Sequence, residues 1–502
     1  MGAKTKVTLA ANSVLWIIVL LFFLFGVFSR LSYTVYDLDM RGTMSRAPHE
    51  DIIVIGIDEE SLRKYGQFPW ERDVYVPFLQ KVSEARVIAF DIMFNTDSRD
   101  KESDRLLAEE LAKHDNVILA TSLELETALS RTVKIRPGDP LYAGVWNKPI
   151  PELAEAAELA HIFRLKEPDG VVRRTHLMID TPEGPVYSLA YRIAEMYGAD
   201  VAHYLESKPK TEQMRAASPK TEQLIRFNAH SNEFMTIPFH AVEGMDPEFF
   251  RDRIVLVGIT APGEDVGTTP VDNAMYLVYV HANIVDQLLK GEEVSIAADL
   301  VLFGLIVLVL ALTTWLTWQL KAIAGFIYLV AATVAIIAGQ YGVFSAKLVF
   351  VDPVYPLFAL YVGFLGNISI KTYYETKQKN YITKQFGRYI SPDLVREIAR
   401  SGKEIELGGI NKELSILFLD VRGFTTLSEK LRPEEVVGFL NMMFDLITEK
   451  ALENHGTIDK FIGDAAMILF NAPLDVPNHP YYAVKTAYDI QRGMESVRQQ
   501  IL

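Results

Sequence analysis

The sequence of 502 residues contains no cysteine. This absence excludes disulfide bridges, Cys-ligated zinc, iron–sulfur clusters and thiol chemistry. Basic residues are in the minority, with 50 Lys and Arg against 64 Asp and Glu, and the net charge is −14. We therefore expect no nucleic-acid partner. Hydrophobic residues make up 49% of the chain and charged residues 23%, a mixture that predicts soluble domains joined to membrane spans.

Four apolar runs are long enough to cross a bilayer. The first, Val14–Phe28, is extended by Thr8–Ala11 and follows Lys4 and Lys6. A cleaved signal peptide is the alternative for this run, but no small-residue cleavage site follows it. For the other three, the alternative is a buried hairpin, which their uncharged length and basic flanks disfavour. These three runs are Leu300–Trp318, Ala322–Phe344 and Val354–Ile370.

The charges beside these runs predict their orientation. Lys371, Lys377 and Lys379 follow the last run, and the positive-inside rule places this segment and the N-terminus in the cytoplasm. Four spans then leave residues 30–295 outside the cell, a segment with 29 Lys and Arg against 44 Asp and Glu. The expected organisation is a cytoplasmic N-terminus (1–7), a first transmembrane helix (8–29), an extracellular domain (30–295), three transmembrane helices (296–370), a cytoplasmic linker with a transducer helix (371–409) and a cytoplasmic domain (410–502).

The segment 30–295 has the pattern of an α/β domain. Apolar strands alternate with helices, and a parallel sheet is the usual result. Asp58 and Asp91 end two of these strands, and ligands bind beyond the carboxyl ends of strands in open α/β sheets. Together with Arg72 and His281 they are candidates for a sensor pocket. Local capping and pairing is the alternative, and the favoured one. The expected strands are 51–58, 86–95, 117–121 and 253–258, and the expected helices 59–65 and 102–113.

Residues 413–501 read as strand, helix, strand, strand, helix, which is typical of an α+β ferredoxin-like palm. The first strand ends at Asp420, and Asp464 lies in the hairpin between strands 457–462 and 465–470. Two carboxylates brought together at strand ends can hold two Mg²⁺ or Mn²⁺ ions for an in-line phosphoryl displacement. The turn Val421–Thr425 offers backbone N–H groups to a triphosphate.

Two strings in this domain resemble class III nucleotidyl cyclases: FLDVRGFT at 418–425 and KFIGDAAM at 460–467. The resemblance implies that Asp420, Asp464 and the carbonyl of Val421 bind two metals. It also implies that Gly423, Phe424 and Thr425 contact phosphate, and that Lys460 donates to adenine N1, although a solvent-facing lysine is the alternative. The Gly-Gly-Asp/Glu-Glu-Phe hairpin of diguanylate cyclases is absent.

The segment 30–290 is similar to CHASE-type sensor domains of the second class, which lie outside bacterial membranes. Together the resemblances imply a multi-pass receptor adenylate cyclase of the inner membrane, which converts ATP to cyclic AMP and pyrophosphate. The expected partners are ATP, a second copy of the chain, the lipid bilayer and an unknown extracellular signal. The motifs behind the CHASE resemblance are DEESL (58–62), FPW with Arg72, AFDIMF (89–94), VGIT (257–260), Thr269-Pro270 and VHAN (280–283).

The cyclase family's domain runs beyond the position of Leu502. We therefore expect this chain to lack the C-terminal half of the catalytic domain, and to have little activity as it stands. A guanylate cyclase, and a catalytically inactive membrane receptor that works by dimerising, remain the alternatives.

Overall fold

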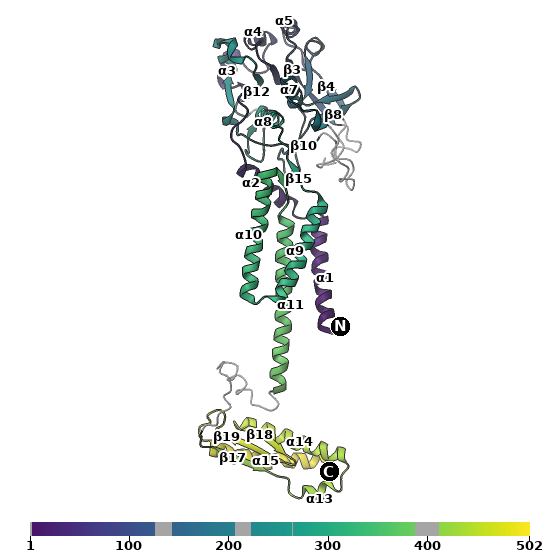
Figure 1. Cartoon of the computed structure of the whole chain (residues 1–502), viewed down its shortest axis with the longest axis vertical. Helices are drawn as coiled ribbons and strands as arrows, with labels where there is room; N and C mark the ends of the chain where they lie inside the picture. Colours follow the sequence, from purple (N-terminus) through teal and green to yellow (C-terminus); the bar gives the residue numbers. More distant parts are fainter. Residues whose placement is uncertain (1–2, 126–142, 206–221, 264, 387–410, 502) are drawn as a thin grey trace. The chain divides into compact units, whose positions relative to one another are not determined.

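The computed structural model describes residues 3–125, 143–205, 222–263, 265–386 and 411–501 (Figure 1). The chain forms two compact units, Met1–Ile368 and Ser369–Leu502. The first contains an α/β domain and most of the apolar helices, and the second contains a small α+β fold. The predicted helix start at Ser391 and Pro392 lies outside the described residues.

Three helices are long and apolar enough to cross a membrane: α9 (Asp299–Gln319), α10 (Ala322–Lys347) and α11 (Val354–Phe386). They run side by side with α1 (Figure 1), and buried Val19, Ile306 and Ala359 join α1, α9 and α11 in one cluster. Three helices are thus found where three transmembrane spans are expected, between residues 296 and 370, and they are candidate spans by length and composition.

The first predicted span, 8–29, is broken in the structure. The helix α1 (Ala3–Leu24) ends early, and α2 (Ser29–Gly42) leaves it at an angle of 67°. Gly26 lies in the break with φ of +60°, a left-handed conformation that glycine adopts without strain. The expectation of one continuous helix over 8–29 is therefore wrong, and the described residues contain three candidate spans, or four if the bent pair is one span.

The α/β domain is built on a seven-stranded sheet in the order β11-β1-β12-β2-β3-β4, with β5 also paired to β3. All its ladders are parallel except β3 with β4. This arrangement confirms the predicted α/β sheet. The strands are β1 (Ile52–Ile57), β2 (Val87–Met93), β3 (Val117–Leu125), β4 (Ala143–Asn147), β5 (Glu158–His161), β11 (Met235–Pro238) and β12 (Ile254–Ile259).

Helices cover both faces of this sheet, which explains why its strands read as continuous apolar runs. Alternate residues of β1 enter two separate clusters: Val54 packs with α7 and α8, whereas Ile55 packs with α4 and α5. The α/β domain also contains short paired strands. The helices are α3 (Glu59–Tyr65), α4 (Tyr75–Lys81), α5 (Lys101–Leu111), α6 (Pro151–Ala154), α7 (Leu189–Tyr197) and α8 (Leu277–Leu289), and the short strands β6 (Arg164–Leu165), β7 (Arg174–His176), β8 (Met178–Thr181), β9 (Gly184–Tyr187), β10 (Glu222–Leu224), β13 (Val266–Gly267), β14 (Met275–Tyr276), β15 (Ser295–Ile296) and β16 (Val349–Phe350).

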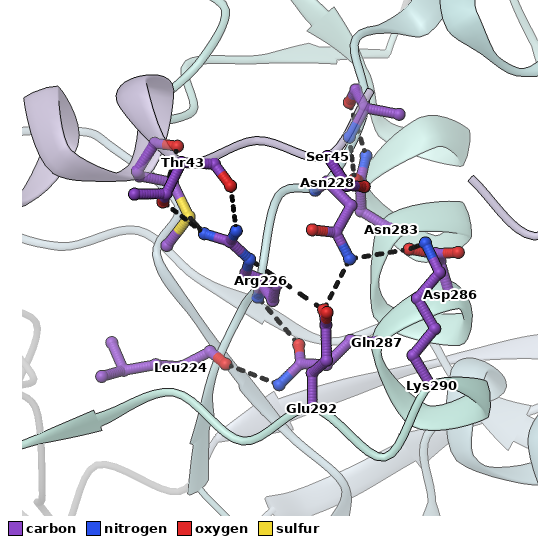
Figure 2. A network of polar contacts seen from close by, with 12 residues as sticks. Thr43, Ser45, Leu224, Arg226, Asn228, Asn283, Asp286, Gln287, Lys290 and Glu292 are labelled. Atoms are coloured by element: carbon purple, nitrogen blue, oxygen red, sulfur yellow. Dashed lines mark hydrogen bonds and ion pairs between the residues drawn. The ribbon is translucent and has the colours of Figure 1, made fainter. Parts of the chain in front are cut away.

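A polar network ties the end of α2 to the α/β core (Figure 2). Arg226 donates to the carbonyl oxygen of Thr43 and, at 2.8 Å, to its hydroxyl. The backbone N–H of Arg226 in turn donates to Gln287 of α8 at 2.8 Å. Asn228 donates to Asp286, one residue before Gln287, at 2.9 Å. The chain leaving the apolar helices is therefore held by the buried helix α8.

The second unit contains a three-stranded antiparallel sheet in the order β17-β19-β18. Helices α14 and α15 pack on one face through Met443, Ile447 and Ile490. Both hairpin strands have the bounds predicted from the sequence. The elements are β17 (Ser415–Leu419), α13 (Phe424–Ser428), α14 (Pro433–Glu453), β18 (Thr457–Ile462), β19 (Ala465–Phe470) and α15 (His479–Ile501).

Candidate functional site

The paired aspartates of the second unit lie at one end of its sheet. Leu419 is the Cα partner of Ala466, so Asp420 follows directly after the last paired residue of β17. Asp464 lies in the two-residue turn between β18 and β19. Continuing the ladder by one residue would set Asp420 beside Ala465, and Asp464 is the next residue. The backbones at positions 420 and 464 therefore lie at the same end of the sheet.

The turn after Asp420 is closed by hydrogen bonds from its own backbone N–H groups. A carboxylate oxygen of Asp420 accepts a hydrogen bond from the N–H of Val421 at 3.0 Å. The carbonyl oxygen of Val421 accepts from the N–H of Phe424 at 3.2 Å. Gly423 has φ of +78°, in the left-handed region, so a residue with a side chain would be strained here. Thr425 belongs to the short helix α13 that follows.

Lys460 lies on β18 beside an irregularity in the ladder between Ile458 and Lys460. Its side chain is 59% exposed, and its ammonium group is 3.1 Å from the carboxylate of Asp459. Its Cα partner on β19 is Met467, which is also the partner of Phe418 on β17. Lys460 therefore shares a row of the sheet with Phe418, two residues before Asp420.

One face of this sheet is open. Along β17 exposed and half-buried residues alternate, and Phe418 is 64% exposed. Ile416 on the same strand and Ile462 on β18 are exposed as well. Asp420 has the parity of Ile416 and Phe418, so it belongs to the open face. The two helices cover the other face, where Ile468 and Phe470 are fully buried.

The donor set at this end of the sheet fits a hard divalent cation. Asp420 is exposed and Asp464 half-buried, and no lysine or arginine in the described ranges forms an ion pair with either carboxylate. Carboxylate oxygens are the ligands that Mg²⁺ and Mn²⁺ prefer. Within the same ranges there is no group of three or more His, Asp or Glu side chains placed for a metal. Further ligands would have to come from backbone, water or nucleotide.

The four candidates for a sensor pocket do not all gather in one place. Asp58 caps α3 by accepting from the N–H of Ser61 at 2.8 Å, and its pKa is lowered by hydrogen bonds from Ser61, against the effect of burial. Arg72 is buried and donates to the carbonyl oxygens of Trp70 and Thr96. Asp58 and Arg72 both have local structural partners, which agrees with the alternative interpretation of local capping and pairing.

Asp91 and His281 do come together. The carboxylate of Asp91 on β2 is 3.8 Å from Nε2 of His281 on α8, and both side chains are buried. Neither has a hydrogen-bond partner within the described residues. Burial raises the pKa of Asp91 and lowers the pKa of His281 well below its ordinary value.

Two neighbouring residues were not predicted from the sequence: His161 on β5 and Arg164 on β6. His161 is fully buried, and burial lowers its pKa to about 3. Arg164 lies 3.9 Å from Asp265, which precedes α8. Neither residue belongs to a recognisable motif. Only the tertiary fold brings them near β3 and α8.

The fold combines an α/β domain, helices long and apolar enough to cross a membrane, and a small α+β unit with two aspartates at one end of its sheet. A family model for the CHASE2 domain matches residues 14–320, which is more than half of the chain. The chain therefore belongs to the CHASE2 domain family. The model of the adenylate and guanylate cyclase catalytic domain matches residues 410–501. Both predicted resemblances are confirmed.

Individual relatives named as adenylate cyclases match short stretches of the chain. Adenylate cyclase 1 of Rhizobium meliloti (strain 1021) is 34% identical over 111 residues, 22% of this chain and 17% of that protein. An adenylate cyclase of Anabaena cylindrica is 40% identical over 88 residues, 17% and 18% of the two chains. The crystal structure of the adenylyl cyclase CyaB from P. aeruginosa has 37% identity, covers 17% of this chain and 45% of that one, and gives a TM-score of 0.17. The matches span less than a fifth of these two curated relatives.

Proposed function

We propose that this protein is a receptor-type adenylate cyclase of a bacterial inner membrane, which converts ATP to 3′,5′-cyclic AMP and pyrophosphate. The proposal is carried by the positions of Asp420, directly after the last paired residue of β17, and of Asp464, in the turn between β18 and β19 at the same end of the sheet. The cyclase family model over 410–501 and the two relatives named adenylate cyclase support the same reaction.

In the proposed site, Asp420, Asp464 and the carbonyl oxygen of Val421 would hold two Mg²⁺ or Mn²⁺ ions. When bound, such ions supply positive charge to the attacking ribose 3′-oxygen and to the leaving phosphates. The turn around Gly423 offers its backbone to the triphosphate, with Phe424 and Thr425 at the start of α13. A bond forms between the 3′-oxygen and the α-phosphorus as the bond to pyrophosphate breaks, and the 3′-hydroxyl proton is lost.

Lys460 is the residue we assign to base selection. Its ammonium group donates hydrogen bonds only, and adenine N1 is an acceptor, whereas guanine presents a donor at the equivalent position. Its place on the row that contains Phe418 and Met467 supports a role on the open face. The matching family model covers adenylate and guanylate cyclases alike, so a guanylate cyclase is the alternative that the nucleotide assay decides.

We further propose that the open face is covered by a second copy of the chain. Phe418, Ile416 and Ile462 are exposed beside the aspartates, and exposed apolar groups that cluster on one face are typical of an interface. In a homodimer each site would be built from two subunits.

The remaining parts of the proposal concern the membrane. The basic residues after residue 370 and before residue 7 support cytoplasmic termini, and α1 with α2 would make the fourth span. The α/β domain would then lie outside, where it receives a signal. The linker 371–409 would pass this signal on.

The proposal is tested by cyclic nucleotide formation from ATP and from GTP with Mn²⁺, using the membrane-embedded protein. Wild-type protein is compared with Asp420→Asn, Asp464→Asn and the control Asp445→Asn, which changes an exposed aspartate on α14. Loss of product in the first two variants, on the order of 10²-fold or more, with the control unchanged, is expected. Measurable and equal product in all four proteins would contradict the site assignment.

A further inference from the structure

A cavity of about 280 Å³ opens beside the sheet of the α/β domain. Ser122 and Leu123 of β3 form one wall, directly after the parallel pairing of β3 with β5 ends at Thr121. Arg164 and Lys166, from the segment after β5, form another wall, and Leu277 at the start of α8 closes a third. The cavity thus lies at the carboxyl ends of parallel strands, where open α/β sheets bind ligands.

One hydrogen-bond donor of the cavity lining has no acceptor within the described residues, and a second such donor belongs to His161, the residue before Ile162 of the lining. Nδ1 of His161 accepts from the N–H of Phe163 at 3.2 Å, which leaves the ring proton on Nε2. This Nε2 is buried and has no hydrogen-bond partner in the described part of the chain, and the same is true of Nη1 of Arg164. A buried donor left unpaired costs about 1–3 kcal/mol, and more when the group is charged. Arg164 lines the cavity, so the fold keeps this donor there at a cost that an acceptor would remove.

The charge around the cavity selects the kind of acceptor. Arg164 and Lys166 line it, whereas the nearest carboxylate to Arg164, that of Asp265, is 3.9 Å away and accepts no hydrogen bond from it. The two cations of the lining match an oxyanion, as carboxylates and phosphates are. The cavity lies near the lower end of the 300–1,000 Å³ that small-molecule sites usually occupy, so the ligand is small.

We propose that this cavity is the receptor site of the α/β domain and that it binds a small anion through the side chains of Arg164 and Lys166. The anion carries a carboxylate or a phosphate group. The inference rests on the receptor part of the proposed function and is independent of the catalytic part.

The helix α8 connects this cavity with the chain that enters the membrane helices. Leu277 lines the cavity at one end of α8, and His281 lies beside Asp91 one turn later. At the other end Gln287 holds Arg226, which binds Thr43 at the end of α2 (Figure 2). A ligand that moves Leu277 would therefore act on α8, whose far end is linked through Arg226 to the end of α2.

The test is anion binding to the full chain in nanodiscs, measured by isothermal titration and by thermal unfolding at constant ionic strength. No nucleotide or divalent metal is present, so an inactive cyclase leaves the result intact. The probes are inorganic phosphate, pyrophosphate, acetate, succinate and citrate, with glycerol as the neutral control. Saturable binding of a carboxylate or a phosphate, but not of glycerol, is expected, and the preferred probe identifies the group.

Two variants locate the binding. Arg164→Gln and Lys166→Gln should each weaken the affinity for the preferred anion about tenfold or more, since each removes a charged hydrogen bond. Lys166 is exposed, so its variant should fold as the wild type does. Arg63→Gln, which changes an exposed arginine on α3, is the matched control and should bind normally. No saturable binding by any of the five anions, or equal affinity in wild type and both cavity variants, overturns the proposal.

Discussion

Leu419 and Ala466 are Cα partners in the ladder between β17 and β19, and this pair sets the position of both aspartates. Asp420 follows the first, and Asp464 lies two residues before the second. Because the ladder fixes both backbones, the carboxylates lie at the same end of the sheet. Helices α14 and α15 occupy the other face, so this end stays accessible to a nucleotide.

The base preference should depend on Lys460. In Lys460→Glu the donor becomes an acceptor, which suits the donor edge of guanine instead of adenine N1. We expect the ratio of ATP to GTP turnover to fall about tenfold or more, measured as kcat/KM for each nucleotide. Lys430→Glu changes an exposed lysine of the same unit and should keep the ratio. An unchanged ratio in Lys460→Glu would remove this residue from the base-binding site.

Self-association should depend on the open face of the sheet. Phe418→Glu places a charge where an apolar interface is proposed, so we expect dimers to dissociate at about tenfold or higher protein concentration than in the wild type. Mass photometry of the nanodisc-embedded protein measures this change. Val484→Glu alters an equally exposed apolar residue on α15 and is expected to leave the dimer intact. Equal dissociation concentrations for the wild type, Phe418→Glu and Val484→Glu would place the interface elsewhere.

The stability of the α/β domain should fall with acid below about pH 6.5. Burial lowers the pKa of His161 to about 3 and that of His176 to about 4. The unfolded chain therefore takes up these protons first, and the free energy of unfolding is lost as the pH falls from about 6.5 toward 4. Each histidine contributes a slope of up to about 1.4 kcal/mol per pH unit. The raised pKa values of Asp91 and Asp265 act in the opposite direction, but His281, whose pKa is also lowered, makes three histidines against these two carboxyl groups.

Thermal unfolding between pH 7.5 and 5 measures this slope. His176→Asn should flatten it, whereas His203→Asn, at an exposed histidine, should not. A melting temperature that stays constant or rises on acidification would show that these histidines are protonated in the folded protein.

The packing of α8 on the sheet should be sensitive to one added methyl group. A Cβ at Gly258 of β12 would lie 2.6 Å from the side chain of Val278, so the helix would have to move. We expect Gly258→Ala to lower the free energy of unfolding by about 1–3 kcal/mol. At Gly244 an added Cβ meets nothing within 4 Å, so Gly244→Ala serves as the control. Equal unfolding temperatures for the two variants would contradict the close packing of α8.

The sequence predicts those parts of the fold whose pattern is local. Strands β18 and β19 were predicted to the residue, because a Gly-Asp turn separates two apolar runs. The helix α8 was not predicted, since it is buried on all sides and has no amphipathic stripe to show its period. The break after Leu24 was also missed, because apolar residues continue on both sides of Gly26.

The residues of the candidate sites also differ in whether a local sequence pattern reveals them. Asp420 and Asp464 are recognisable because each stands in a specific motif at a strand end. His161 and Arg164 are not recognisable from the sequence. Their significance depends on β3, α8 and a cavity, which come together only in the folded structure. Asp58 was singled out for its place after a strand, yet the structure gives it the ordinary role of a helix cap.

The most direct test of the central claim is Mn²⁺ binding by the membrane-embedded protein, measured by electron paramagnetic resonance with a non-cyclisable ATP analogue. Wild-type protein and Asp445→Asn should bind Mn²⁺, and Asp420→Asn and Asp464→Asn should each lose most of this binding. Such a result would be independent of turnover. Undiminished Mn²⁺ binding in both Asp420→Asn and Asp464→Asn would contradict the account, because the two carboxylates would then not share a metal site.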